Sequence, residues 1–119
     1  MEKYLYFMEQ TDNAFDAAQD AVCYPLSSFQ GFSANGTINQ FLMHFSGVLG
    51  QDEDAYDVVT LTMTSNNIQK EVMEALTDRF NAPMIPGDGK QFIVVADDSN
   101  SVFADSRITG CAIAATAVD

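Results

Sequence analysis

The sequence predicts a β-rich α+β domain: a small antiparallel sandwich or partly open barrel of about six or seven strands with one helix. Two observations lead to this fold class. Short runs of β-branched and aromatic residues recur along the chain, and one segment, about 67–81, has helical periodicity. With 119 residues, 47% of them hydrophobic, residues 1–119 can bury one core and are expected to form a single domain.

The first predicted strand, 3–8, is apolar on both faces. Tyr4 and Tyr6 alternate with Leu5 and Phe7, and alternate residues of a strand point to opposite sides of a sheet. Such a strand is typical of a sheet that is covered on both sides, or of a surface where another chain binds.

Four further strands are expected before the helix. Pro25 lacks a backbone donor and marks a strand end or a sheet edge. Asn35-Gly36 predicts a hairpin with a type I′ turn, in which both central residues have positive φ. The predicted strands are 21–26, 28–33, 37–48 and 58–64, the last with threonines alternating with apolar residues.

The helix at about 67–81 has one apolar face and one solvent-facing side. Asn66 is expected to cap its first turn, and Gln69, three residues later, completes an approximate capping box. The apolar stripe consists of Ile68, Val72, Leu76 and Phe80. Prolines and glycines then end the helix, and the strands predicted after it are 91–96, 101–104 and 108–118.

The charge balance excludes several classes of partner. Seventeen acidic residues against five basic ones give a net charge of −12, and the basic residues are scattered singly. A protein that binds nucleic acid or an anionic membrane needs clustered Lys and Arg, so neither is expected as a partner. No apolar run approaches the length of a transmembrane helix, and the first residues do not resemble a signal peptide.

Few residues suit catalysis, and we expect no enzyme and no cofactor. Cys23 and Cys111 lie far apart, match neither a disulfide framework nor a zinc site, and are expected to be buried reduced thiols. His44 is the single histidine, and we expect it to be a packing or interface residue. A Cys–His nucleophile lacks any supporting local pattern.

Clustered carboxylates are the candidates for a metal site. Hard cations such as Ca²⁺ prefer oxygen ligands from acidic loops, but the loop pattern of an EF-hand is absent, and a solvated turn explains the same residues. Asp97 and Asp98, placed after a predicted strand, can also cap a turn. The weak metal-ligand candidates are Asp52, Asp54, Asp57, Asp97 and Asp98.

Three parts of the chain carry a resemblance to a known group of proteins. They are Lys3–Phe7, Lys70–Leu76, and Phe92–Asp98 followed by Asp105–Cys111. Together they resemble small uncharacterised proteins of tailed phages that infect marine bacteria, often encoded beside virion genes. The resemblance covers both ends and the helix, about half of the chain, and implies a particle or assembly protein without assigning any site residue.

Two functional hypotheses follow. The first is a non-enzymatic structural or assembly protein of a marine phage, which forms a homo-oligomer and contacts other virion proteins. It would occupy the host cytoplasm during assembly and then the virion. The alternative is a small acidic binding module for Ca²⁺ or for a basic protein surface, including DNA mimicry.

Overall fold

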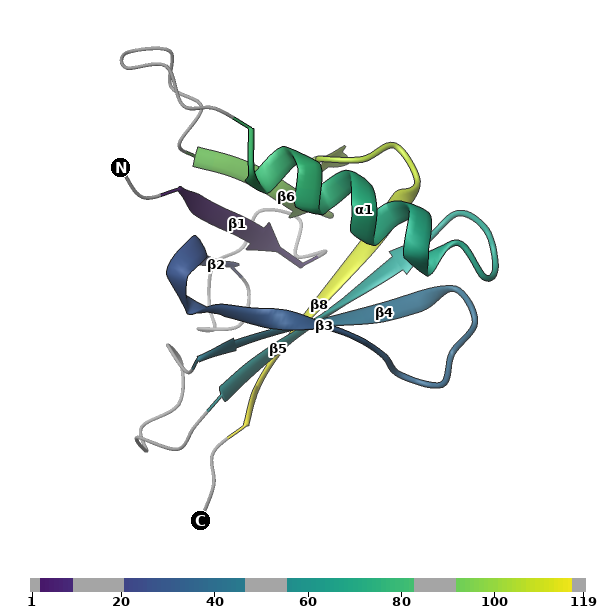
Figure 1. The fold of residues 1–119 in the computed structure, drawn as a ribbon, viewed down its shortest axis with the longest axis horizontal. Coiled ribbons are helices and arrows are strands. Elements are labelled where there is room, and N and C mark those ends of the chain that lie inside the picture. The colour runs from purple at the N-terminus through teal and green to yellow at the C-terminus, as the bar shows by residue number, and fades with distance from the viewer. Residues whose placement is uncertain (1–2, 10–20, 47–55, 83–91, 117–119) are drawn as a thin grey trace.

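The computed structural model describes residues 3–9, 21–46, 56–82 and 92–116. Within them it has eight strands, a 3₁₀ turn at Leu26–Ser28 and one α-helix (Figure 1). The strands are β1 (Tyr4–Met8), β2 (Ala21–Pro25), β3 (Phe29–Ala34), β4 (Gln40–Ser46), β5 (Tyr56–Met63), β6 (Phe92–Asp97), β7 (Val102–Phe103) and β8 (Ile108–Thr116), and the helix is α1 (Gln69–Phe80).

The strands form two four-stranded sheets. Sheet A has the order β2-β1-β6-β7, and sheet B has the order β3-β4-β5-β8. All pairings are antiparallel except that of β1 with β6, which is parallel. Neither sheet closes on itself, so the prediction of a β-rich, mostly antiparallel α+β fold is confirmed, and the open sandwich is the form that the chain adopts.

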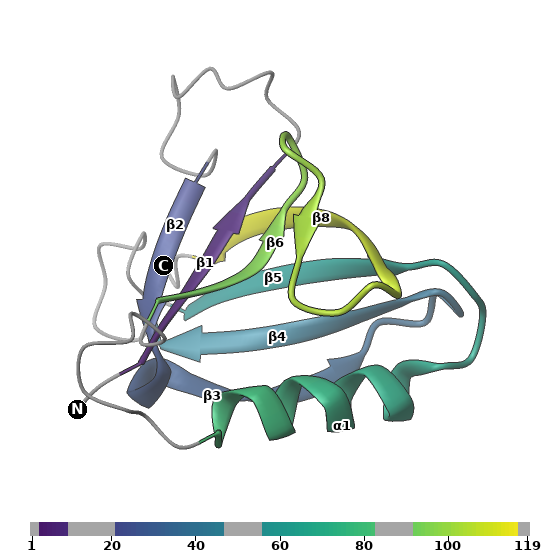
Figure 2. The same cartoon turned by 90° about the horizontal axis from the view of Figure 1, so that it is seen from above.

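The core lies between sheet B and a second layer made of sheet A and α1. Figure 2 shows α1 beside sheet A, both over one face of sheet B. The helix contributes Val72, Leu76 and Phe80 to this core. Between the two sheets the ring of Tyr24 stacks on that of Phe45, with 4.1 Å between ring centroids. Each fully buried side chain of this size stabilises the fold by about 1.5–3 kcal/mol.

The apolar stripe of α1 is confirmed, but its predicted cap is wrong. The helix begins at Gln69, its N-cap is Ile68, and no side chain caps the first turn. The Gln69 side chain instead donates hydrogen bonds to the carbonyls of Ile38 and Gln40. A contact with a distant hairpin thus takes the place of the local capping box, because the carbonyls of this hairpin lie within reach of the first turn. This helix, the one α-helix of the described residues, is too short and too polar to span a membrane.

The C-terminal end of α1 is held by a buried lysine. The Lys3 ammonium donates to the carbonyl of Phe80 at 2.5 Å and also to that of Ala82. These carbonyls have no partner within the helix, and a positive charge is favourable at that end of the helix dipole. The first residues of the described chain therefore fix the position of the helix relative to sheet A.

The β3–β4 hairpin forms as predicted, with a different turn. Gly36 has φ of +88°, while Asn35 does not have positive φ, so the turn is not type I′. Asn35 accepts a hydrogen bond from the Thr37 amide, and β4 begins at Gln40 instead of residue 37. The local side-chain hydrogen bond of Asn35 stabilises a longer loop.

Two carboxylates join the sheets along the unpaired edge of β8. The Ile113 amide donates to Glu9 at 2.5 Å, and the Cys111 amide donates to Asp98 at 3.4 Å. Glu9 and Asp98 directly follow the parallel strands β1 and β6, whose ends meet through the hydrogen bond from the Asp98 amide to the carbonyl of Met8. The two carboxylates thus accept hydrogen bonds from backbone amides that would otherwise be unpaired at the edge of sheet B.

Candidate interaction surface

The outer face of sheet A is mostly apolar. Leu5 and Phe7 point into the core, so strand alternation places the intervening residues of β1 on the outside. The pairing of the strands aligns these outward residues in rows across the sheet. We call these rows the outer face of sheet A. The rows are Pro25-Tyr4-Phe92, Cys23-Tyr6-Val94 and Ala21-Met8-Asp97-Val102, of which Met8 is only 1% exposed and adds no open apolar surface.

This face exposes large apolar side chains to solvent. Tyr4 is 43%, Phe92 52% and Val102 49% exposed, and these are three of the four most exposed large apolar residues in the described chain. The fourth is Ile38, 55% exposed, between β3 and β4. The rings of Tyr6 and Phe92 lie 5.5 Å apart on the face. Clustered exposed aromatic residues are typical of protein interaction sites.

The outer face of sheet A is nearly free of charge. Its one carboxylate, Asp97, accepts hydrogen bonds from the backbone and side-chain amides of Asn100. Burial, and next the charge of Asp97, raise the pKa of the Tyr6 phenol, so this ring stays neutral at physiological pH. The face therefore presents neutral aromatic and aliphatic groups on a protein whose net charge is −12.

Part of this surface follows from the sequence. The two-faced strand 3–8 indicates that one face is covered or binds another chain, and exposed Tyr4 and half-buried Tyr6 lie on that face. The contribution of Phe92 was missed, because it depends on the parallel pairing that places Phe92 beside Tyr4. The sequence signal that could have revealed the contribution of Phe92 is the run of apolar residues in both strands.

The prediction that Asp57 belongs to a solvated acidic loop is wrong. Asp57 is the second residue of β5, it is 0% exposed, and it accepts a hydrogen bond of 2.8 Å from the Tyr24 hydroxyl. The strand starts two residues earlier than predicted, and alternation then points Asp57 inward together with Val59. The phenol donor makes this burial possible, and burial and the hydrogen bond raise the pKa of Tyr24.

The other metal-ligand candidates do not converge in the described chain. Asp97 binds Asn100 and Asp98 binds the Cys111 amide, while Asp52 and Asp54 lie outside the described residues. Among the residues that the structure describes, no three His, Cys, Asp or Glu side chains are arranged to hold a metal ion. The Asp97 contact is instead the turn-capping geometry proposed for it.

His44 lies half-buried on the outward side of β4. Its Nε2 is 2.7 Å from the Ser33 hydroxyl, a partner that the sequence analysis did not identify. Serine and histidine at this distance form part of a nucleophilic site, but no described residue hydrogen-bonds the other ring nitrogen, so the group that would orient the base is missing there. We interpret the pair as a satisfied polar contact.

The two cysteines occupy different environments. Cys111 is partly buried, whereas Cys23 is exposed, so the expectation that both are buried is wrong for Cys23. Strand alternation explains the difference, because the neighbours Val22 and Tyr24 take the inward positions of β2. Burial raises the pKa of both thiols.

Comparisons with protein-family models, with curated proteins and with solved structures give no match for this chain. The function of the protein is therefore inferred from the surface described above.

Proposed function

We propose that this protein is a non-enzymatic structural or assembly protein that acts by self-association and by contacts with other proteins of a phage particle. The outer face of sheet A carries the proposal, because it exposes Tyr4, Phe92 and Val102 together. Burying aromatic side chains supplies much of the free energy of protein association.

The charge distribution favours contact between copies through this face. Each copy has a net charge of −12, so two copies repel each other over most of their surface. The outer face of sheet A has one carboxylate, at its margin, and the remainder can be desolvated without bringing acidic groups together. A two-fold arrangement would place the same apolar rows against each other.

The size of the face indicates a weak contact. Three rows over three or four strands cover roughly 15 by 15 Å, estimated from strand spacing and rise. A stable complex buries roughly 800 Å² per partner. We therefore expect reversible association at tens of micromolar, which becomes effective when many copies are held together in a particle.

The phage setting in this proposal comes from the resemblance of the opening strand, helix and later strands to small phage proteins. A particle component would be made in the host cytoplasm and then become part of the virion. Binding of the purified protein to purified particles tests this setting separately from self-association.

Sedimentation velocity over a concentration series, from micromolar to hundreds of micromolar, tests the proposed self-association. The wild-type protein is expected to show a weight-average sedimentation coefficient that rises with concentration. Phe92→Ser removes the most exposed ring of the face and is expected to weaken association by about tenfold or more, the cost typical of losing an interface anchor.

Ile38→Ser is the matched control, because Ile38 is equally exposed but lies outside the outer face of sheet A. It should associate like the wild type. A wild-type protein that stays monomeric throughout the series and also fails to bind particles would refute the proposal. Equal effects of the two substitutions would show that association uses a different surface.

A further inference from the structure

A second surface feature lies on the outward side of α1. A shallow hollow of about 480 Å³ is lined, among the described residues, by Gln69, Lys70, Met73, Glu74, Thr77 and Asp78. Met73 is the one apolar residue among these six and is partly buried against the core, so the rest of the apolar surface comes from the aliphatic parts of polar side chains. Methionine adapts to differently shaped apolar partners and is frequent at binding surfaces.

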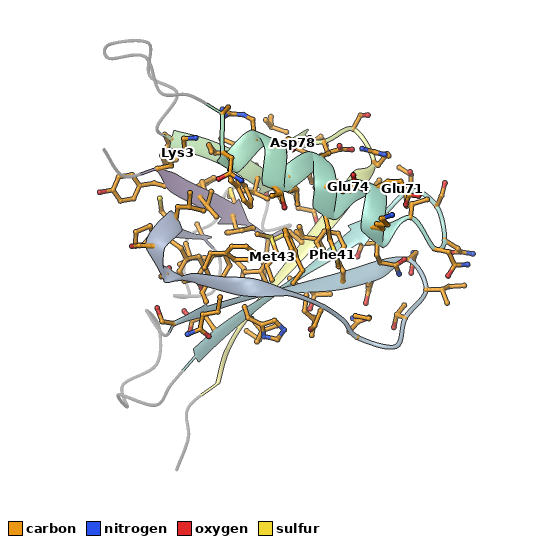
Figure 3. The ribbon with its side chains drawn as sticks, in the orientation of Figure 1. Lys3, Phe41, Met43, Glu71, Glu74 and Asp78 are labelled. Atoms are coloured by element: carbon orange, nitrogen blue, oxygen red, sulfur yellow. The ribbon has the colours of Figure 1, made fainter. Side chains whose placement is uncertain are left out.

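The rim of this hollow is acidic. Glu74 and Asp78 are exposed and four residues apart, so they lie one turn apart on the same side of the helix. Figure 3 shows both side chains on the side of α1 that faces away from Phe41 and Met43 of sheet B. Neither carboxylate forms a salt bridge within the described chain. Lys70 is the one cation of the rim, near the start of the helix.

We propose that this hollow binds a basic amphipathic segment of another protein, with apolar side chains over Met73 and cationic side chains at Glu74 and Asp78. An amphipathic helix that places its apolar face in a groove is a common mode of recognition. The hollow has room for a few apolar side chains, and the two carboxylates provide the complementary charge.

The negative charge of the rim favours a basic partner over a second copy of this chain or nucleic acid. A second copy of this chain would bring its own acidic surface against Glu74 and Asp78, which like charges disfavour. Nucleic acid is disfavoured for the same reason. The surface is separate from the outer face of sheet A, so the inference does not depend on the proposed self-association.

A designed peptide can serve as the probe. We would use a short fluorescent helical peptide of leucine and lysine, with leucines on one face, and measure anisotropy on titration with the full chain. The wild-type protein is expected to bind it. The double variant Glu74→Lys/Asp78→Lys should bind about tenfold more weakly, because two attractive charge contacts become repulsive.

Glu71→Lys is the control for overall charge, because Glu71 is on the same helix but does not line the hollow. It should change affinity by less than about threefold, as expected for one exposed charge. A peptide with serine in place of leucine tests the apolar anchor and should bind more weakly. Equal binding of the two peptides, or equal loss in Glu71→Lys and the double variant, would overturn the proposal. Melting curves of the variants verify that they are folded.

Discussion

At the scale of single residues, the contact between Tyr24 and Asp57 is the main polar link inside the core. It joins β2 of sheet A to β5 of sheet B across the core of the sandwich. A buried carboxylate is unfavourable unless hydrogen bonds compensate for its lost hydration. The Tyr24 ring also stacks on Phe45, so the residue contributes packing and a donor at the same position.

Tyr24→Phe should destabilise the protein by about 1–3 kcal/mol, because it removes a donor to a buried carboxylate and keeps the ring. Urea denaturation measures the change. Tyr6→Phe, on the outer face of the adjacent strand, is the control and should cost less than about 0.5 kcal/mol. Equal costs would show that the Tyr24 hydroxyl contributes little to stability.

The pH dependence of stability provides a second readout of Tyr24. Its native pKa is raised above that of the unfolded state, by burial first and then by Asp57. The unfolded chain therefore loses this proton near pH 10 while the native protein keeps it. Stability should fall as pH rises above about 10, and this fall should be smaller in Tyr24→Phe.

At the scale of elements, the edge of β8 is the feature that the sequence could least reveal. Glu9 and Asp98 are distant from β8 along the chain, and only the parallel pairing of β1 and β6 brings them to its amides. Gly110 lies beside this contact, where an added Cβ would be 3.6 Å from the Asp98 carboxylate. That distance is an ordinary van der Waals contact, so the carboxylate contact does not depend on glycine at this position.

Glu9→Ala should speed hydrogen exchange of the Ile113 amide by about tenfold, because an edge amide that loses its acceptor exchanges with water more readily. Residue-resolved NMR measures this rate. Asp105→Ala is the control, since the Asp105 carboxylate pairs with Arg107 and not with an amide of β8. If Ile113 exchanges at an unchanged rate in Glu9→Ala, the carboxylate does not protect the edge.

The helix and most strands could be predicted from the sequence because their signals are local. Periodicity located α1 and the alternating threonines located β5 to within two residues of each end. The parallel pairing, the contact of Gln69 with the hairpin and the burial of Asp57 depend on distant partners. From the sequence alone Asp57 is expected to be solvated, because its hydrogen-bond donor Tyr24 lies 33 residues away along the chain.

At the scale of the whole molecule, the distribution of charge separates two kinds of surface. The outer face of sheet A carries one carboxylate, whereas the hollow on the outward side of α1 carries Glu74 and Asp78 (Figure 3). The first surface suits contact with a like-charged copy, and the second suits a basic partner. A small protein with both could bind to itself and to a different protein at the same time.

The native cysteines report which surface is covered in the assembled protein. Cys23 lies on the outer face of sheet A, and Cys111 lies in β8, the edge strand of sheet B. Burial raises the pKa of both thiols, and the charges of Glu9 and Asp98 raise that of Cys111 further. Because the thiolate is the reactive form, Cys111 should resist alkylation at pH 8 until the protein unfolds, while exposed Cys23 reacts.

Self-association through the outer face of sheet A should slow the alkylation of Cys23 as protein concentration rises. Mass spectrometry with iodoacetamide at pH 8 measures the rate at each concentration. In Phe92→Ser the rate should depend much less on concentration, and in Ile38→Ser it should behave as in the wild type. Sedimentation that shows association while Cys23 reacts at a constant rate would place the contact on another surface. Because alkylation reports on one residue and sedimentation on mass, the two measurements together test both the existence and the location of the contact.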